Sequence, residues 1–210
     1  MPARTELRRL PRQSRGRRRV DALLEAAAAE ISAAGYDAAT MSAIASRAGA
    51  SIGSLYQFFP NKAAIVQALR GHYCDEFELL WAPLAGEARH LSLEALVARM
   101  VDLTVLFIER HPAFLALLDA PACTYNSPAV RERFPKLVAT FFLARRPRMA
   151  REKALRLARM TLHMIKAMNF LYRDLSPPER RPYVQEFKIL LQRYLECRMD
   201  HQNNGAGNWN

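Results

Sequence analysis

One stretch near the start of the chain, residues 40–62, restricts the fold more than any other. It reads TMSAIASRAGASIGSLYQFFPNK and contains three side chains of the kind that cap helix N-termini, namely Thr40, Ser51 and Asn61. Gly49 and Pro60 lie where the first two of these segments would end, because glycine and proline both interrupt a helical backbone. The stretch therefore predicts two short helices joined by a tight turn, which is the layout of a helix-turn-helix.

Apolar residues recur at helical spacing through the rest of the chain, and the sequence contains no pattern typical of a strand. Ser92 is a further N-cap candidate, Gly35 could end the first helix, and Pro135 should kink or divide its helix. The expected helices span about residues 20–34, 41–48, 52–58, 62–80, 93–111, 114–118, 129–146, 150–175 and 178–199. The sequence thus predicts an all-α fold.

Arginine is concentrated at the N-terminal end of the chain. The formal net charge is +11, and residues 1–19 contain eight arginines but one acidic residue, Glu6. A basic arm of this kind suits a polyanion, because neutralising phosphates releases their counterions. The alternative is a disordered tail that only keeps the protein in solution.

Cysteine and histidine provide no pattern for metal binding or covalent chemistry. The three cysteines and five histidines are widely separated, and no Ser/His/Asp, Cys/His or paired-carboxylate arrangement stands out. We therefore expect no metal, no cofactor and no enzymatic activity. No apolar run is long enough to span a membrane, and none follows the basic start as in a signal peptide, so we expect a cytoplasmic protein without membrane contacts.

Residues 40–62 resemble the helix-turn-helix of the TetR family of transcriptional regulators. The positions that match the family pattern in one register are Thr40, Ile44, Ala45, Ala48, Gly49, Ser51, Gly53, Leu55, Tyr56, Phe59 and Lys62. The resemblance covers about residues 17–70, and beyond them only the length, the helical pattern and two strong final helices agree. The chain departs from the usual pattern at Ala50, where valine is common. It also departs from similar members at Phe58 and Ala63, where tyrosine and an acidic residue are frequent.

The resemblance implies a DNA-binding regulator, most often a repressor, that binds a palindromic operator as a homodimer and responds to a small molecule. The implied regions are a disordered basic arm (1–16), a helix-turn-helix domain (17–62), an effector-binding and dimerisation domain (63–200) and a disordered tail (201–210). Two other functions stay open. One is sequence-nonspecific coating of DNA, which the basic arm suggests, and the other is a small-molecule enzyme on the same fold.

The same resemblance assigns polar side chains of the helix-turn-helix to double-stranded DNA. Three would hold the phosphate backbone, which positions a protein without reading sequence: Thr40, Tyr56 and Lys62. Four would face the bases: Ser42, Ile52, Ser54 and Gln57. The amide of Gln57 can pair with an adenine edge, which makes it the sharpest candidate for sequence reading.

Four neighbouring residues of this stretch are expected to support those contacts. Gly53 is small enough to let the helix backbone approach a groove, and Ser51 should act mainly as a helix cap while lying beside the DNA. Leu55 and Phe59 are expected to be core residues that hold the short helix on the first helix of the domain.

The last two helices are expected to form the dimer interface. Residues 160–172 are almost entirely apolar, and a helix that is apolar all round is buried on more than one side. In the final helix an apolar stripe, widened by Leu190, consists of Val184, Phe187, Leu191, Tyr194 and Leu195. The alternative is the ordinary core of a monomer.

A largely apolar small-molecule effector is expected to bind near the same helices. Methionine adapts to irregular ligands, and a few polar groups in an apolar wall can orient them. The candidate residues are Phe107, Phe114, Tyr125, Phe141, Met160, His163, Met164, Met168 and Asn169. For each of them, plain core packing is the alternative interpretation.

Overall fold

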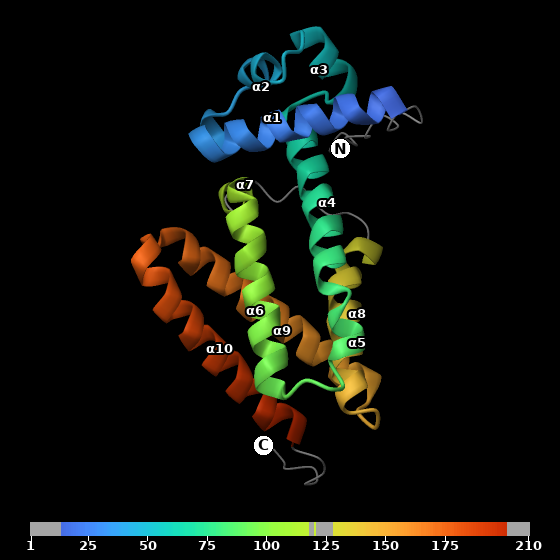
Figure 1. The fold of residues 1–210 in the computed structure, drawn as a ribbon. Coiled ribbons are helices and arrows are strands. Elements are labelled where there is room, and N and C mark those ends of the chain that lie inside the picture. Colours follow the sequence, from blue (N-terminus) through green and yellow to red (C-terminus); the bar gives the residue numbers. More distant parts are fainter. Residues whose placement is uncertain (1–13, 118–119, 121–127, 201–210) are drawn as a thin grey trace, which may run out of the picture. The chain divides into compact units, whose positions relative to one another are not determined.

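The computed structural model describes residues 14–117, 120 and 128–200, and every regular element within them is a helix. The helices are α1 (Ser14–Ala38), α2 (Met41–Arg47), α3 (Ile52–Phe58), α4 (Lys62–Trp81), α5 (Leu84–Glu87), α6 (Leu93–Arg110), α7 (Pro112–Ala116), α8 (Pro128–Arg145), α9 (Arg151–Asp174) and α10 (Pro177–Asp200) (Figure 1). The predicted all-α fold class is confirmed. Residues 1–13 of the basic arm, Tyr125 and the tail from 201 onwards lie outside the described residues.

Local side-chain chemistry sets where several helices begin, and the four predicted N-caps are confirmed. In each case a side-chain oxygen accepts a hydrogen bond from a backbone N–H three residues later, which satisfies a donor that has no partner within the helix. The bonds are Ala43 N–H to Thr40 Oγ1 at 3.1 Å, Ser54 N–H to Ser51 Oγ at 3.1 Å, Ala64 N–H to Asn61 Oδ1 at 2.9 Å and Ala95 N–H to Ser92 Oγ at 3.0 Å.

Four features of the helices differ from the sequence-based expectation. The helix α1 begins at Ser14, inside the arginine-rich segment, because arginine is itself a good helix former. The four-residue helix α5 was not expected, since an element of one turn is too short to show periodicity. Gly35 has φ +80° and interrupts α1 without ending it, and α8 continues through Pro135 without being divided.

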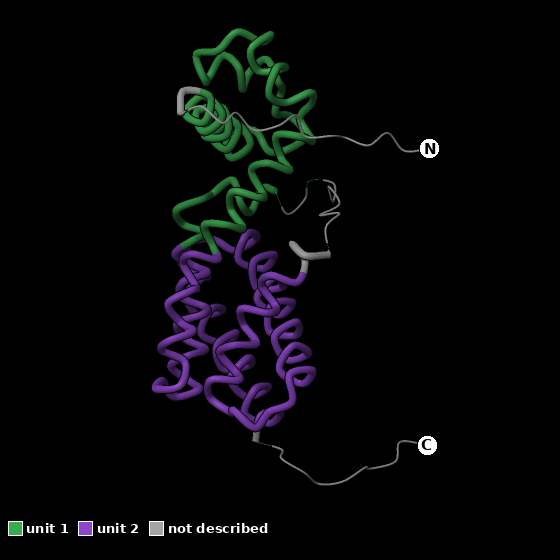
Figure 2. Tube along the Cα trace, turned by 90° about the vertical axis from the view of Figure 1, so that its right-hand side faces the viewer, with its two compact units in different colours: residues 1–77, 107–126 green, residues 78–106, 127–210 purple. Residues whose placement is uncertain are grey.

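The chain divides into two compact units, residues 1–77 with 107–126 and residues 78–106 with 127–210 (Figure 2). In the first unit α2 packs against α1 and against α3, and α7 packs against α1. The centre of this unit consists of fully buried aliphatic side chains from four helices: Leu23, Ala27 and Ile31 of α1, Ile44 of α2, Leu55 of α3 and Ile65 of α4.

An aromatic cluster forms a second part of this core. The ring of Phe107 lies edge-on to the rings of Tyr73, Phe77 and Phe114, with centroids 5.8, 5.0 and 5.3 Å away. His111 also packs on Phe107, and its Nε2 lies 2.8 Å from a carboxylate oxygen of Glu76. Burial, and secondly the charge of Glu76, raise the pKa of Tyr73 to about 12, so its phenol is neutral at physiological pH.

The second unit is built on α9, which packs against α8 and α10, while α5 packs against α8. The buried face of α9 consists of Ala154, Leu157, Ala158, Thr161, Ile165, Met168, Asn169 and Tyr172. Trp81 packs near Phe141 of α8 with ring centroids 6.4 Å apart. The ammonium group of Lys188 in α10 lies 2.6 Å from a carboxylate oxygen of Asp102 in α6, which ties these two helices together. None of the helices in the described residues has the length and apolar character needed to cross a bilayer.

We expect Phe107→Ala to lower the free energy of unfolding by about 3–5 kcal/mol, because it removes the ring at the centre of the aromatic cluster and leaves a cavity. Phe107 is 1% exposed. Leu79→Ala is the control, since Leu79 is 75% exposed and its truncation should change stability by less than about 0.5 kcal/mol. Urea unfolding followed by circular dichroism measures both, and equal losses in the two variants would contradict the proposed role of the cluster.

Candidate nucleic-acid interface

A left-handed turn joins the two helices of the helix-turn-helix. Gly49 has φ +58°, a conformation in which a side chain is strained. The N–H of Gly49 donates to the carbonyl of Ser46 at 3.0 Å, and that of Ala50 donates to Ala45 at 2.9 Å. These bonds close the C-terminal end of α2 in the manner of a helix that ends on glycine, and they fix the direction in which α3 leaves the turn.

Two apolar side chains hold α3 on the rest of its unit. Leu55 has no exposed surface and Phe59 is 2% exposed, so both are core residues, as the sequence predicted. Because they lie four positions apart, they occupy one side of the helix and turn the opposite side outward. That opposite side is the candidate interface.

Most of the predicted DNA contacts lie on the outward side of α3 or at the start of α2. The exposed members are Thr40, Ser42, Ser51, Ile52, Gly53, Tyr56 and Gln57, whereas Ser54 and Lys62 are half-buried. Ile52 is 40% and Tyr56 is 49% exposed, which leaves two large apolar bodies facing solvent. The hydroxyls of Thr40 and Ser51 accept N–H groups of their own helices, and each keeps its own proton available to donate to a phosphate oxygen.

Gly53 has no steric reason within the described residues to be glycine. A Cβ atom built on it would meet nothing within 4 Å, and its φ is not in the left-handed region. Glycine in a helix costs up to about 1 kcal/mol relative to alanine, so the position gives up stability without an internal benefit. The predicted place of Gly53 against a groove therefore stays a prediction, which a substitution can test.

The ammonium group of Lys62, a predicted phosphate contact, is engaged within the protein. Its Nζ donates to three backbone carbonyls, those of Tyr36 at 2.6 Å, Asp37 at 2.9 Å and Ala39 at 2.9 Å. An ammonium group has three N–H donors, so all of them are used inside the protein. Contact between this side chain and a phosphate stays a prediction, and it would require at least one of these bonds to open.

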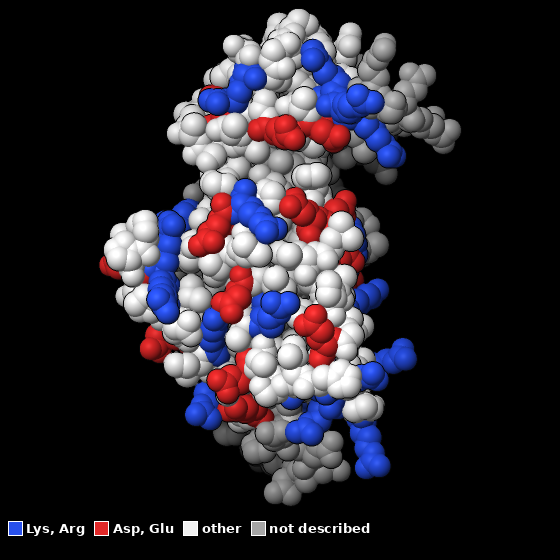
Figure 3. Space-filling view, in the orientation of Figure 1, with Lys and Arg blue, Asp and Glu red and all other residues white. Residues whose placement is uncertain are grey.

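The charged side chains around the interface lie beside α3 rather than on it. Arg47 of α2, which sequence reasoning did not include, is exposed and forms an ion pair with Glu30 of α1 at 3.0 Å. Its signal in the sequence was its positive charge at the end of the first helix of the helix-turn-helix. Figure 3 shows basic side chains gathered over the start of α1, where Arg17 and Arg18 are exposed, followed by acidic ones along the same helix.

The predicted effector residues that the structure describes are divided between the two units. Phe107 and Phe114 belong to the aromatic cluster of the first unit, whereas the other described candidates belong to the second unit. There Phe141, Met168 and Asn169 are buried, Met164 is half-buried, and Met160 and His163 are exposed on the other side of α9. Helical periodicity explains the split, because positions 160 and 163 face away from positions 161, 165 and 168.

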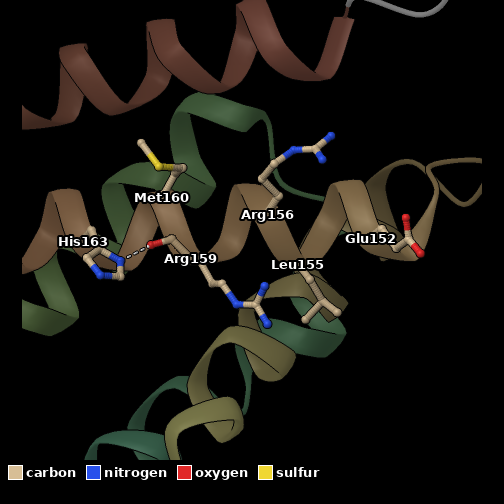
Figure 4. A pocket seen from close by; sticks show the side chains of 6 residues that line it. All are labelled: Glu152, Leu155, Arg156, Arg159, Met160 and His163. Carbon is tan, nitrogen blue, oxygen red and sulfur yellow. Dashed lines mark hydrogen bonds between the residues drawn. The ribbon is translucent and has the colours of Figure 1, made fainter.

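A hollow of about 520 Å³ lies along the exposed side of α9 (Figure 4). Its lining residues are Glu152, Leu155, Arg156, Arg159, Met160 and His163. Two of them are already engaged: Arg159 forms an ion pair with Glu132 at 2.8 Å, and its carbonyl lies 2.7 Å from Nδ1 of His163. Within the described residues no group of three or more His, Cys, Asp or Glu side chains is arranged to hold a metal ion.

Two family models match the chain, and together they span most of its length. "Bacterial regulatory proteins, tetR family" matches residues 23–69, and "Tetracyclin repressor-like, C-terminal domain" matches residues 92–195. The chain belongs to the TetR family. It is therefore a DNA-binding transcriptional regulator of the helix-turn-helix type with a ligand-binding C-terminal domain, in a family where repression and homodimers are typical.

Solved structures of TetR-family proteins share the fold. A TetR-family transcriptional regulator from Streptomyces coelicolor is 24% identical with a TM-score of 0.66, and the alignment covers 85% of this chain and 98% of that one. The fatty acid degradation regulator FadR from Bacillus halodurans is 16% identical with a TM-score of 0.63, covering 83% and 94%. A TetR variant from Acinetobacter baumannii in complex with minocycline is 14% identical with a TM-score of 0.61, covering 86% and 97%. No curated protein sequence matches the chain.

We expect Gly53→Ala to leave this TetR-family protein as stable or to stabilise it by up to about 1 kcal/mol, because alanine favours the helix. The same change should weaken DNA binding, since a methyl group would stand where the backbone approaches the groove. Gly71→Ala is the matched control: Gly71 lies within α4, and a Cβ there also meets nothing within 4 Å. Thermal unfolding and operator titration measure both variants. Parent-like DNA affinity in Gly53→Ala would show that nothing approaches this position closely.

Proposed function

We propose that this TetR-family regulator is a ligand-responsive repressor that binds a palindromic operator as a homodimer. The observation that carries the proposal is the outward side of α3, which is uncharged, bears hydroxyl and amide groups, and is held in place by buried Leu55 and Phe59. A surface of this kind suits the major groove, where base edges are read by short polar groups. In this proposal Tyr56 and Thr40 bind phosphates while Gln57 reads a base.

Outward-facing apolar side chains on α9 and α10 support homodimer formation. Met160 of α9 is exposed, as are Tyr183, Ile189 and Leu190 of α10. Leu190 is 55% exposed, and clusters of large exposed apolar residues mark interaction surfaces. A dimer would present two recognition helices about 34 Å apart, which matches successive major grooves on one side of DNA.

The apolar stripe that the sequence indicated for α10 lies mainly on the other side of the helix. Val184, Leu191 and Leu195 are buried within the chain. They contribute to the core of the second unit, so they are poor positions for testing association. Ile189 and Leu190, which the helix turns outward beside that stripe, are the better ones.

Two buried polar atoms on α9 support an effector site in the second unit. Within the described residues, Thr161 Oγ1 and Asn169 Oδ1 are buried and have no hydrogen-bond partner. Buried polar groups are almost always paired, and an unpaired one is costly. The two residues are eight positions and about 12 Å apart on one side of the helix, with apolar Ile165 between them. We infer a mainly apolar effector with hydrogen-bonding groups toward both ends, which would favour one of two conformers through its higher affinity for it.

Selection of bound fragments from random and genomic DNA tests the proposal, followed by footprinting of the recovered sites. A palindromic site with two half-sites about one helical turn apart is expected. Recovery of fragments without a shared sequence would favour a protein that coats DNA nonspecifically. Such a protein should also bind with a steep dependence on salt and with no preference among variant sites.

We expect Tyr56→Phe to weaken binding about equally on all sites, because it removes a hydroxyl that contacts phosphate, and phosphates carry no sequence information. Gln57→Ala should instead relax the preference at one base pair, with a loss of about 1–3 kcal/mol of discrimination. Titration of the selected operator and its single-base variants separates the two effects. If Gln57→Ala keeps the parent preference at every position, Gln57 is not a base reader.

We expect Leu190→Arg to weaken self-association at least tenfold, because it places a charge in the apolar surface that the partner would cover. Leu79→Arg is the control, since it introduces the same charge at a side chain of α4 that is more exposed. Sedimentation equilibrium at micromolar concentration measures both. If the parent protein sediments as a monomer, the proposed homodimer is wrong. If the Leu190→Arg variant still forms the dimer, the interface does not include Leu190.

A further inference from the structure

Lys62 connects the two ends of the helix-turn-helix from inside the protein. We infer that it is a positioning residue for DNA binding, whose ammonium group holds α2 and α3 in place instead of binding a phosphate. The inference rests on the proposed DNA-binding function and assigns to Lys62 a role other than the phosphate contact that the family resemblance implied.

The geometry around Lys62 is that of a closed site. Nζ lies 2.6–2.9 Å from the carbonyl oxygens of Tyr36, Asp37 and Ala39, and 4.5 Å from the centroid of the Tyr36 ring. The three carbonyls use every N–H of the ammonium group, and the ring covers it with the electron-rich face that attracts cations. The charge is thus compensated within the protein.

The carbonyls that Lys62 binds follow the interruption of α1 at Gly35. Carbonyl groups at the C-terminal end of a helix have no N–H donor within that helix, and they carry the negative end of its dipole. A cation at this place satisfies both conditions at once. Removing it would leave part-buried carbonyls without their donor, and the link between α1 and α2 would lose its fixed course.

The bonds between Lys62 and the three carbonyls matter for DNA binding because of the two segments that they join. Ala39 immediately precedes Thr40, the N-cap of α2, whereas Lys62 is the first residue of α4 and follows the end of α3. One ammonium group therefore pins the residues just before and just after the helix-turn-helix to each other. An angular error in α2 and α3 would misplace every group on the outward side together, without removing any of them.

The arrangement of the three carbonyls suits the ammonium group of lysine and does not suit the guanidinium group of arginine. Three carbonyls converge on a single nitrogen, which suits a compact ammonium group with three rotatable donors. The guanidinium of arginine is planar and presents its donors as a fork, so it cannot reproduce three bonds to one point. Phosphate, by contrast, accepts either side chain. Lys62→Arg therefore keeps the positive charge but removes the three bonds to the carbonyls. This variant distinguishes a role in positioning the helices from a role in attracting phosphate.

The test compares Lys62→Arg and Lys62→Met with the parent, using full-length protein and the operator selected by the parent. Each titration is repeated at several salt concentrations, below the unfolding temperature of the variant. We expect both variants to lose affinity about tenfold or more, with the slope of log affinity against log salt unchanged. Hydrogen exchange of the amides in residues 41–58, measured without DNA, should become faster in both.

The opposite result would identify a phosphate contact. In that case Lys62→Arg binds like the parent, and Lys62→Met shows a salt slope shallower by about 0.9 for each lost contact. Parent-like binding in both variants would also overturn the inference. If Lys62→Met does not fold, Tyr36→Leu is the substitute, because it removes only the ring that covers the ammonium group. We expect this variant to lose affinity with an unchanged slope of log affinity against log salt. Parent-like affinity would contradict the inference.

Arg70→Met is the matched control for a purely structural effect. The guanidinium of Arg70 also holds backbone carbonyls in the same unit, those of Leu117 and Ala120, and neither of these two residues adjoins α2 or α3 in the sequence. This variant should keep its DNA affinity and its exchange rates in residues 41–58. If the parent protein selects no DNA, the proposed function is wrong. The hydrogen-exchange measurement would still show whether Lys62 holds the helix-turn-helix in place.

Discussion

The burial of Leu55 and Phe59 is the interaction on which the candidate interface depends. The helix α3 has seven residues, and a helix of that length does not persist alone in water, because its nucleation costs more than its few hydrogen bonds return. Two side chains one turn apart attach it to the core of the first unit, and this attachment decides which side is outward. The exposed positions of Tyr56 and Gln57 are thus a consequence of the two apolar residues beside them.

Features that arise from neighbouring residues could be predicted from the sequence. The caps at Thr40, Ser51, Asn61 and Ser92 each join a side chain to a backbone group three residues away, so the sequence contains both partners in a fixed order. The glycine that turns the chain at position 49 is equally local. For the same reason the inward and outward sides of α3 followed from spacing alone.

Features that depend on distant segments could not be predicted in this way. Lys62 is 26 residues from Tyr36, and nothing in the sequence shows that its ammonium group meets three carbonyls at the end of α1. The burial of the effector candidates also depends on distant segments, and their role stays a prediction. Composition pointed to Met160, His163 and Met168 together, but of these three only Met168 is buried.

Charge is arranged so that the candidate interface contributes little long-range attraction. Residues 40–62 contain two charged side chains, and both are engaged: Arg47 pairs with Glu30, and Lys62 binds carbonyls of its own unit. The exposed basic side chains at the start of α1, with the arginines that precede them in the sequence, are a further source of attraction at this end of the chain. Phosphate attraction weakens with salt, whereas hydrogen bonds to base edges set the preference among sites. Since the two are carried by different segments, salt should change how tightly the protein binds far more than which sequence it prefers.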